Sequence, residues 1–374
     1  MKVTASSEMK LIELLYSLGI PAEAVLLSRD GKLLPETAQI SKGEEAEIIF
    51  YKHRPPRLRP GEPPSHWKRA AYSPACAYCR SAPAVYLPYA AQHLCPKHFR
   101  ELFEKRVKRT VRSYGMVKKG ERVGVGVSGG KDSYALLHAL ISLREALPFE
   151  IVAITVDEGI PGYRNRAIDV SRKRCRELGI EQHTYSFREE HGTTIEEIAE
   201  KGKGNPCSYC GVLRRKILNS KARQLGLDRI AIGHNLDDVA QTAMLNLVRN
   251  EPMRFARFNE PIVSGGGFVQ RIRPLREIRE KEVAAYAFLH GHDYDSARCP
   301  HAASALRWSV RHELNSLEDQ YPGTKSRIAS SFNTLQGIVK DSLQGKEVEL
   351  NSCRICGEPC SDEVCMACKM LGEL

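Results

Sequence analysis

The feature that most constrains the fold of this chain is a valine-rich run followed by the motif Ser128-Gly-Gly-Lys-Asp-Ser133. The run that begins at Val123 predicts a buried strand, and Leu136, Leu137 and Leu140 follow the motif at helical spacing. A strand that passes through glycines into a helix leaves backbone N–H groups free, and the helix dipole also favours negative charge there. The motif therefore predicts a phosphate-binding loop.

The spacing of this motif differs from that of the Walker loop, in which four residues separate two glycines ahead of the lysine. An ordinary strand–helix turn with a surface lysine is the alternative, and six specified residues after a buried strand argue against it. Ser128–Ser133 resembles the pyrophosphate loop of the ATP pyrophosphatase superfamily. The resemblance implies cleavage of ATP between the α and β phosphates, with adenylation of a substrate oxygen.

Strand and helix patterns alternate from Glu121 onward, which predicts an α/β fold with a doubly wound parallel sheet. We expect strands at Arg122–Val127, Ile151–Val156, Gln182–Phe187, Arg229–Ile232 and Phe268–Ile272, and helices near 133–146, 164–178, 210–225, 236–249 and 278–290. Ligands bind at the carboxyl ends of such strands. The loops Ser128–Ser133, Thr155–Gly159 and Gly233–Asp238 should therefore form one site.

Two adjacent acids, Asp237 and Asp238, begin one of the expected helices. They could be simple N-terminal caps. At the mouth of a phosphate site we favour a second role, in which they hold Mg²⁺ or polarise the reacting group.

The 374 residues carry a formal charge of +11, and residues 1–50 hold only five Lys/Arg against eight Asp/Glu. The positive charge thus lies in the part with the phosphate loop, and RNA is the expected partner. No apolar run approaches the length of a membrane span or a signal peptide core. We expect a cytoplasmic protein with no membrane partner.

Most of the twelve cysteines stand in C-x-x-C pairs, which favours metal sites over disulfides in a chain of this size. Zn²⁺ takes four soft or borderline ligands at tetrahedral positions, and two short-spaced pairs supply them. The sequence predicts two zinc modules, one from Cys76, Cys79, Cys95 and His98 and one from Cys353, Cys356, Cys365 and Cys368. Cys360 is surplus to the second set, and Cys175 is expected to be structural.

Cys207, Cys210 and Cys299 are one ligand short of a closed zinc site. Three protein ligands leave an open position on a metal, and a set of three thiolates suits iron–sulfur chemistry. Two alternatives remain for these cysteines: a fourth metal ligand that is not a cysteine, or a redox pair with an unrelated third thiol.

The chain before the first zinc module divides into a compact unit at 1–50 and a linker at 51–70 with several prolines. The pattern of the unit, with an Asp30-Gly31 hairpin turn, resembles the β-grasp sulfur carriers of the ubiquitin-like class. We expect the first strand of that family to be missing before Met1, and the Gly-Gly tail is absent because Phe50 runs into the linker. We therefore expect a docking or vestigial module that carries no sulfur.

The remaining domain boundaries are 71–115 for the first zinc module with a basic helix, 116–345 for the ATP-binding domain and 346–374 for a zinc ribbon. The basic helix has an apolar face and a face with Lys105, Arg106, Lys108, Arg109 and Arg112. That second face is either a solvated surface or an RNA backbone contact.

Residues 76–368 together resemble the tRNA 2-thiolation enzymes of the TtuA/TtcA type, in the subgroup with a zinc module at each end. The resemblance implies a [4Fe–4S] cluster on Cys207, Cys210 and Cys299, with Mg²⁺ and ATP as further cofactors and tRNA as substrate. It implies catalytic roles for Cys207, Cys299, Arg214 and Asp238. Nucleotide contacts are expected at Gly126, Ser128, Gly129, Gly130, Lys131, Asp132, Ser133, Thr155, Val156, Gly233 and Asp238.

Arg214 stands where some members of this family have a lysine, and arginine keeps the charge but does not shuttle a proton. The segments Asp238–Asn250, Arg271–Arg276 and Tyr321–Lys325 look more like the archaeal and eukaryotic wobble-uridine enzymes, with the T-loop uridine at position 54 as the alternative. The sulfur donor is expected to be sulfide or a separate ubiquitin-like carrier protein. A homodimer stays open.

Overall fold

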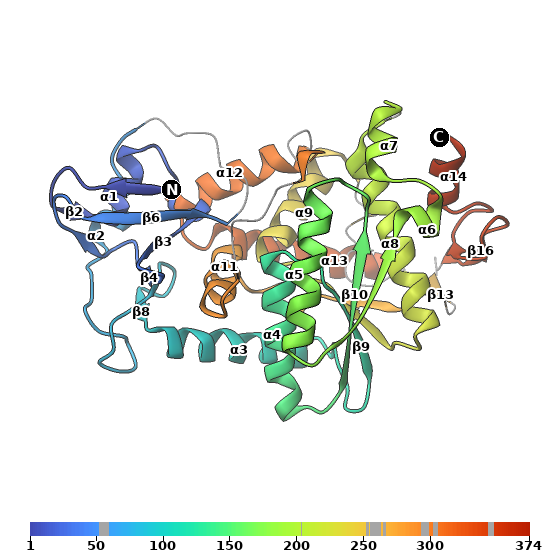
Figure 1. Ribbon diagram of the computed structural model, residues 1–374, viewed down its shortest axis with the longest axis horizontal. Coiled ribbons are helices and arrows are strands. Elements are labelled where there is room, and N and C mark those ends of the chain that lie inside the picture. Colours follow the sequence, from blue (N-terminus) through green and yellow to red (C-terminus); the bar gives the residue numbers. More distant parts are fainter. Residues whose placement is uncertain are drawn as a thin grey trace.

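A five-stranded parallel sheet forms the centre of the molecule in the computed structural model (Figure 1). The structure describes residues 1–51, 60–202, 204–251, 254, 263–264, 267–292, 299–301, 306–342 and 348–374. The strands lie in the order β11 (Glu181–Ser186), β10 (Glu150–Asp157), β9 (Arg122–Gly126), β12 (Arg229–Ala231) and β14 (Gln270–Ile272). The strand order reverses between β9 and β12, which is where such sheets bind ligands. The predicted fold class is confirmed.

Successive residues of β10 contribute to two hydrophobic cores. Ile151 and Ala153 belong to one, and Val152 and Ile154 belong to the other. Side chains alternate across a strand, so these two cores lie on opposite faces of the sheet. The helices of this domain are α4 (Lys131–Ala146), α5 (Tyr163–Glu177), α6 (Phe187–His191), α7 (Ile195–Glu200), α8 (Pro206–Gln224), α9 (Leu236–Val248), α11 (Glu280–Leu289), α12 (Leu306–Gln320) and α13 (Thr324–Ser342).

The expected helices are confirmed, with small shifts in their limits. α8 begins four residues before its predicted start because Asn205 caps it, accepting from Cys207 N–H at 2.9 Å, and because proline suits the first helical position. Cys207 and Cys210 therefore lie together in its first turns. Among the described residues, no helix combines the length and the apolar character that a bilayer crossing requires.

The two cysteine-rich segments lie toward opposite ends of the molecule (Figure 1). The first consists of the hairpin β7 (Val85–Leu87) and β8 (Gln92–Leu94), followed by the long helix α3 (Pro96–Ser113). The second consists of β16 (Asn351–Ser352), β17 (Pro359–Cys360) and α14 (Met366–Gly372). A short parallel pair, β13 (Val263–Ser264) and β15 (Val348–Glu349), precedes it.

The N-terminal unit is an antiparallel sheet of order β1-β6-β3-β4 with one helix. Asp30 and Gly31 both have positive φ in the predicted hairpin turn. The expectation that a strand is missing at the start needs correction, because Lys2–Thr4 pairs with β6. Its elements are β1 (Lys2–Thr4), β2 (Met9–Lys10), α1 (Leu11–Ser17), a 3₁₀ turn (Ala22–Ala24), β3 (Val25–Arg29), β4 (Lys32–Leu34), β5 (Gln39–Ile40) and β6 (Glu45–Phe50). The β-grasp assignment itself stays a prediction.

The second half of the predicted linker is folded. Residues 52–59 lie outside the described part of the chain, but Ser65–Arg69 form the helix α2. Trp67 in this helix is 1% exposed, within the core of the N-terminal unit. Its indole N–H donates to Asp319 at 3.0 Å. Burial of a large aromatic ring outweighs the tendency of the prolines around it toward an extended chain.

Candidate active site

An open cavity of about 400 Å³ lies at the carboxyl ends of β9, β10 and β12. The three loops that the sequence assigns to one site all reach it, as predicted. The cavity is lined by Gly126, Val127, Ser128, Asp132, Ser133, Ile154, Val156, Glu158, Arg164, Arg214, Arg215, Leu218, Ile232, Gly233, His234, Asp238, Arg271 and Arg273. It is the size of a nucleotide-binding site, whereas a second cavity beside the N-terminal unit holds only about 30 Å³.

Hydroxyl groups hold the motif after β9 in a tight turn. Ser133 Oγ donates to Gly130 O at 2.9 Å and accepts from Ser128 N–H at 3.2 Å, and Gly130 N–H donates to Ser128 Oγ at 3.3 Å. Gly129 has φ +83°, and a Cβ there would lie 2.3 Å from Ala167 O. Gly233 approaches the motif closely as well, since a Cβ on it would lie 3.0 Å from Asp132 C. Glycine is required at position 129, whereas at position 233 a side chain would be tightly packed against Asp132.

Four of the predicted nucleotide contacts do not line the cavity: Gly129, Gly130, Lys131 and Thr155. The Lys131 ammonium is buried and forms ion pairs with Asp132 at 2.8 Å and with Glu280 at 2.9 Å. The Thr155 hydroxyl donates to Val127 O at 2.8 Å and accepts from Gln182 at 2.7 Å. In this structure Thr155 joins neighbouring strands, and Lys131 joins the motif to the start of α11.

The two adjacent acids at the start of α9 have different environments. Asp238 lines the cavity and also completes the capping box of α9, accepting from Asn235 N–H at 3.2 Å. Asp237 is 2% exposed, accepts from Glu280 N–H at 2.8 Å and forms an ion pair with Lys325. The expectation of a paired role at the reaction centre is therefore corrected, because the carboxylate of Asp237 has structural partners. Of these two acids, Asp238 is the one that lines the cavity.

Five arginines give the cavity a concentrated positive charge, and sequence reasoning assigned only Arg214 to the site. Burial, together with neighbouring arginines, lowers the pKa of Arg215 to about 10 and that of Arg273 to about 10. Crowded cations of this kind are stabilised by a bound anion. The available signal was the run Arg271-Ile-Arg273, which ends one of the predicted strands and so reaches the same edge of the sheet.

Glu158 and Arg164 are two further cavity residues that sequence reasoning missed. Arg164 is 3% exposed, forms an ion pair with Glu158 at 2.6 Å and donates to Ser128 O at 3.0 Å. It therefore fixes the motif against the end of β10. Glu158 also accepts from Arg214 at 3.3 Å, so Arg214 is held in the cavity.

The three cysteines without a fourth ligand lie beside this cavity. Burial raises the pKa of Cys210 to about 11, Arg214 opposes the effect, and a charged Cys299 or Cys207 adds to it. Burial and a charged Cys299 also raise the pKa of Cys207. The pKa values of Cys207 and Cys210 thus respond to other thiols of this set, but among the described residues the three do not form a cluster as compact as the two four-ligand sets. Arg214 lies one helical turn from Cys210 and two turns from Cys207, and a cation near a thiol favours its thiolate form.

The two predicted zinc modules bring their ligand atoms together, each set within 4.8 Å. In the first, Cys79 and Cys95 have their sulfur atoms 3.8 Å apart, and His98 Nδ1 lies 3.4 Å from Cys95 Sγ. In the second, Cys356 and Cys365 have their sulfur atoms 3.7 Å apart. A tetrahedron of sulfur atoms around zinc has an edge of about 3.8 Å, so the geometry of both sets fits zinc.

Backbone N–H groups support the thiolate form in both sets. The hydrogen bond from Cys365 N–H lowers the pKa of Cys353 to about 6. Burial opposes the same effect at Cys76, but backbone donors, led by that of Cys95, lower its pKa to about 6 as well. Cys360 lies outside the second set, and Cys175 is a buried thiol whose pKa burial raises to about 11.

The basic face of α3 is only partly free for RNA. Lys105, Lys108, Arg109 and Arg112 are exposed. Arg106 instead forms an ion pair with Glu282 at 2.5 Å and donates to Glu277 O at 2.9 Å, which attaches α3 to α11.

Comparison with known proteins gives matches over most of the chain. The PP-loop domain family matches residues 99–318. The tRNA 2-thiolation protein NcsA of Haloferax volcanii is 34% identical over 313 residues, which are 79% of this chain and 98% of that protein. The cytoplasmic tRNA 2-thiolation protein 1 of Saccharomyces cerevisiae is 33% identical over 321 residues, 83% of this chain and 89% of that protein.

Two further relatives differ in the uridine that they modify. The tRNA-5-methyluridine(54) 2-sulfurtransferase of Pyrococcus horikoshii is 35% identical over 79% of this chain and 93% of its own length. The solved structure of the U34-tRNA thiolase NcsA from Methanococcus maripaludis, which holds a [4Fe–4S] cluster, matches with a TM-score of 0.70 and 33% identity. That match covers 81% of this chain and 97% of the other.

Proposed function

Because the chain belongs to the PP-loop family of tRNA 2-thiolation proteins, we propose that it is an ATP-dependent tRNA-uridine 2-sulfurtransferase. The observation that carries the proposal is that residues of the phosphate-binding loop line the same cavity as an arginine that interacts with the cysteines. Ser128, Ser133 and Asp238 line it together with Arg214, which interacts electrostatically with the thiols of Cys207 and Cys210. A site that activates a substrate with ATP and a site that holds sulfur chemistry are thus adjacent.

The first step is adenylation of the uridine. O2 of the base attacks the α-phosphorus of ATP, the bond to the β-phosphate oxygen breaks, and pyrophosphate leaves. Arg215, Arg271 and Arg273 supply the positive charge that stabilises the leaving pyrophosphate. Asp238 is the residue placed to hold Mg²⁺ on the nucleotide.

The second step is displacement of AMP by sulfur. A sulfur nucleophile attacks C2, the C2–O bond to AMP breaks, and 2-thiouridine and AMP form. Arg214 stabilises the negative charge of the thiolates and of the departing AMP. The donor set of Cys207, Cys210 and Cys299 fits a [4Fe–4S] cluster, which would supply an iron open to a sulfur ligand.

The wobble uridine at position 34 is the proposed target, supported by the U34-tRNA thiolase to which the chain is 33% identical. Position 54 is the second candidate, because the Pyrococcus relative is 35% identical. Zinc in both four-ligand sets, sulfide or a separate carrier protein as donor, and a cytoplasmic location like that named for the yeast relative complete the proposal.

The test is anaerobic incubation of the reconstituted protein with ATP, Mg²⁺, sulfide and unmodified tRNA. We expect equal amounts of 2-thiouridine and AMP. tRNA transcripts with cytidine at position 34 or at position 54 serve as matched substrates. Loss of product only with the first confirms the wobble position, and loss only with the second assigns position 54.

A protein that binds tRNA but forms neither AMP nor 2-thiouridine, with its cluster intact, would contradict the proposal. AMP formation that is unchanged by Cys299→Ala would indicate a different adenylating enzyme of the same superfamily.

A further inference from the structure

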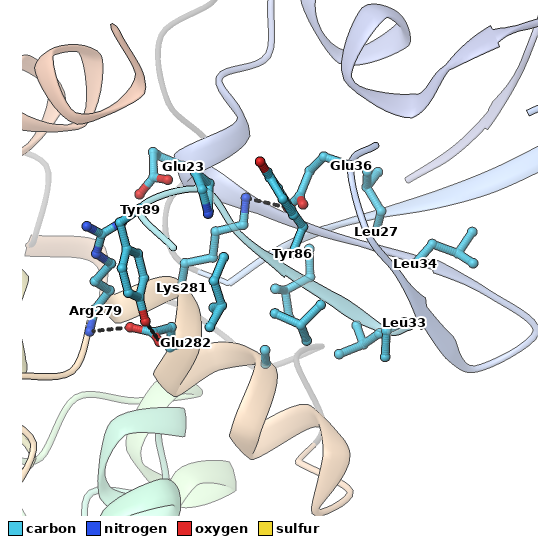
Figure 2. A pocket seen from close by; sticks show the side chains of 16 residues that line it. Glu23, Leu27, Leu33, Leu34, Glu36, Tyr86, Tyr89, Arg279, Lys281 and Glu282 are labelled. Carbon is cyan, nitrogen blue, oxygen red and sulfur yellow. Dashed lines mark hydrogen bonds and ion pairs between the residues drawn. The ribbon is translucent and has the colours of Figure 1, made fainter. Parts of the chain in front are cut away.

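The N-terminal unit is closely packed against the PP-loop domain. Figure 2 shows part of the interface, where Lys281 of α11 reaches Glu36 of the N-terminal unit at 2.5 Å. The cavity between the two surfaces is small, with a volume of about 30 Å³. The interface also contains Thr37, whose hydroxyl lies 2.7 Å from His93 Nε2 of the first zinc module.

One of these contacts leads toward the active site. Glu23 lies in the 3₁₀ turn of the N-terminal unit, and its Oε2 is 3.6 Å from Nζ of Lys325, in the first turn of α13. The Lys325 ammonium also pairs with Asp237 in the first turn of α9. The three side chains are at most 7% exposed. A lysine with so little access to water depends on both carboxylates for its stabilisation.

Asp237 transmits this contact to the cavity. Its other oxygen accepts from the N–H of Glu280, so Asp237 joins the N-terminal ends of α9, α11 and α13. The next residue, Asp238, lines the cavity. The cap of the same helix, Asn235, donates to Asp132 of the phosphate-loop motif at 2.9 Å.

A second contact reinforces the first. The hydroxyl of Tyr51, the residue that directly follows β6, donates to the backbone carbonyl of Glu23. The Tyr51 ring lies 5.7 Å from Nζ of Lys131, whose ammonium pairs with Glu280 and Asp132. The N-terminal unit thus contacts charged groups that hold both the motif and the start of α9.

We propose that Glu23 and Lys325 are positioning residues, through which the N-terminal unit holds Asp238 in the geometry that adenylation requires. Neutralising Glu23 removes one of the two ion pairs described for Lys325, and the first turn of α9 loses a constraint. The kinetic consequence rests on the function proposed above, and the structural consequence does not.

The test compares Glu23→Gln with Glu36→Gln in the full chain. Both glutamates are buried, with side chains that are 7% exposed, and both pair with a lysine across the same interface. Glu36 pairs with Lys281 of α11, however, and among the described residues only Glu23 of the two pairs with Lys325. For Glu23→Gln we expect about a tenfold fall in kcat for AMP formation, with KM for tRNA unchanged. We also expect faster hydrogen exchange in a peptide that spans residues 235–240. Glu36→Gln should lower Tm by about as much as Glu23→Gln does. It should change neither kcat for AMP formation nor hydrogen exchange at residues 235–240.

Equal kcat and equal exchange in the two variants would overturn the proposal. If the Glu23→Gln protein does not accumulate, Tyr51→Phe is the milder variant to use. Unchanged hydrogen exchange at residues 235–240 in the Tyr51→Phe protein would also overturn the proposal. If the wild-type protein forms no AMP but exchange still distinguishes Glu23→Gln from Glu36→Gln, the proposed function fails and the positioning role stands.

Discussion

Asp319 is an acid of α12 whose partners come from the N-terminal unit and α2. It accepts from the indole N–H of Trp67 and pairs with the hydroxyl of Tyr16. Burial raises its pKa to about 7, against the opposing effect of Lys325. The folded protein therefore binds a proton that the unfolded chain has already released at pH above about 4. Stability from this group is fully present below pH 4 and is lost as the pH rises through 7.

We predict that Asp319→Asn removes this pH dependence, because the amide resembles the protonated acid. Between pH 5 and pH 7 the wild type should lose on the order of 1 kcal/mol per pH unit relative to the variant. Thermal unfolding of both proteins at pH 5, 6, 7 and 8 measures the difference, and at pH 8 the variant should have the higher Tm. Parallel curves would contradict the prediction.

Gly129 and Gly130 are adjacent in the motif, but only one of them requires glycine. Gly129 has φ +83° and no room for a Cβ, whereas Gly130 has φ −86° and its nearest neighbour to a new Cβ is Ser128 Oγ at 3.5 Å. We predict that Gly129→Ala costs about 1–3 kcal/mol and abolishes nucleotide binding. Gly130→Ala is the matched control and should bind ATP with an affinity within a few-fold of wild type. Titration with ATP and thermal unfolding check both.

At the scale of elements, the C-terminal cysteine set supports the helix that carries Cys207 and Cys210. Buried cysteines of that set share a hydrophobic core with α8, and Lys216 of α8 donates to Cys368 Sγ at 3.8 Å. We predict that Cys365→Ser removes one zinc per chain, because a tetrahedral site loses one of four ligands. Faster hydrogen exchange in α8 and weaker iron retention should follow.

Cys360→Ser is the matched control for this prediction. It lies in the same segment but outside the four-ligand set, so metal content should not change. Metal analysis of the two variants checks the prediction, and equal zinc loss from both would contradict it.

At the scale of the whole molecule, positive charge exposed on α3 is available to the tRNA backbone. Three exposed basic residues of this helix are Lys105, Lys108 and Arg112. Arg106 on the same helix instead forms an ion pair with Glu282. We predict that the triple alanine variant of the exposed residues binds tRNA more weakly and that the slope of log K against log salt falls by about 1 per lost phosphate contact. Binding isotherms at several salt concentrations measure it.

The control for the salt experiment is an alanine variant of two exposed lysines on the N-terminal unit, Lys32 and Lys42. Their removal changes the net charge without touching α3 and should leave the slope unchanged. A slope that responds equally to both variants would show that α3 makes no particular contact.

Local patterns in the sequence determined the central architecture and the metal-ligand sets. Strand and helix periods repeat within a few residues, and a C-x-x-C pair closes its chelate in one turn, so neighbouring residues suffice to predict them. The convergence of the three loops followed from the rule for parallel sheets, and Cys76, Cys79, Cys95 and His98 meet as expected.

Tertiary structure alone decided which polar groups face the cavity and which hold the fold together. Lys131 and Asp237 are of the residue types expected in a phosphate site. Each instead forms an ion pair with a residue from a distant segment, Lys131 with Glu280 and Asp237 with Lys325. The pairing of Tyr16 with Asp319 spans 303 residues of chain. Such contacts depend on how whole units pack, and no local period records them, because the energy of a buried ion pair comes from exclusion of water by the complete fold.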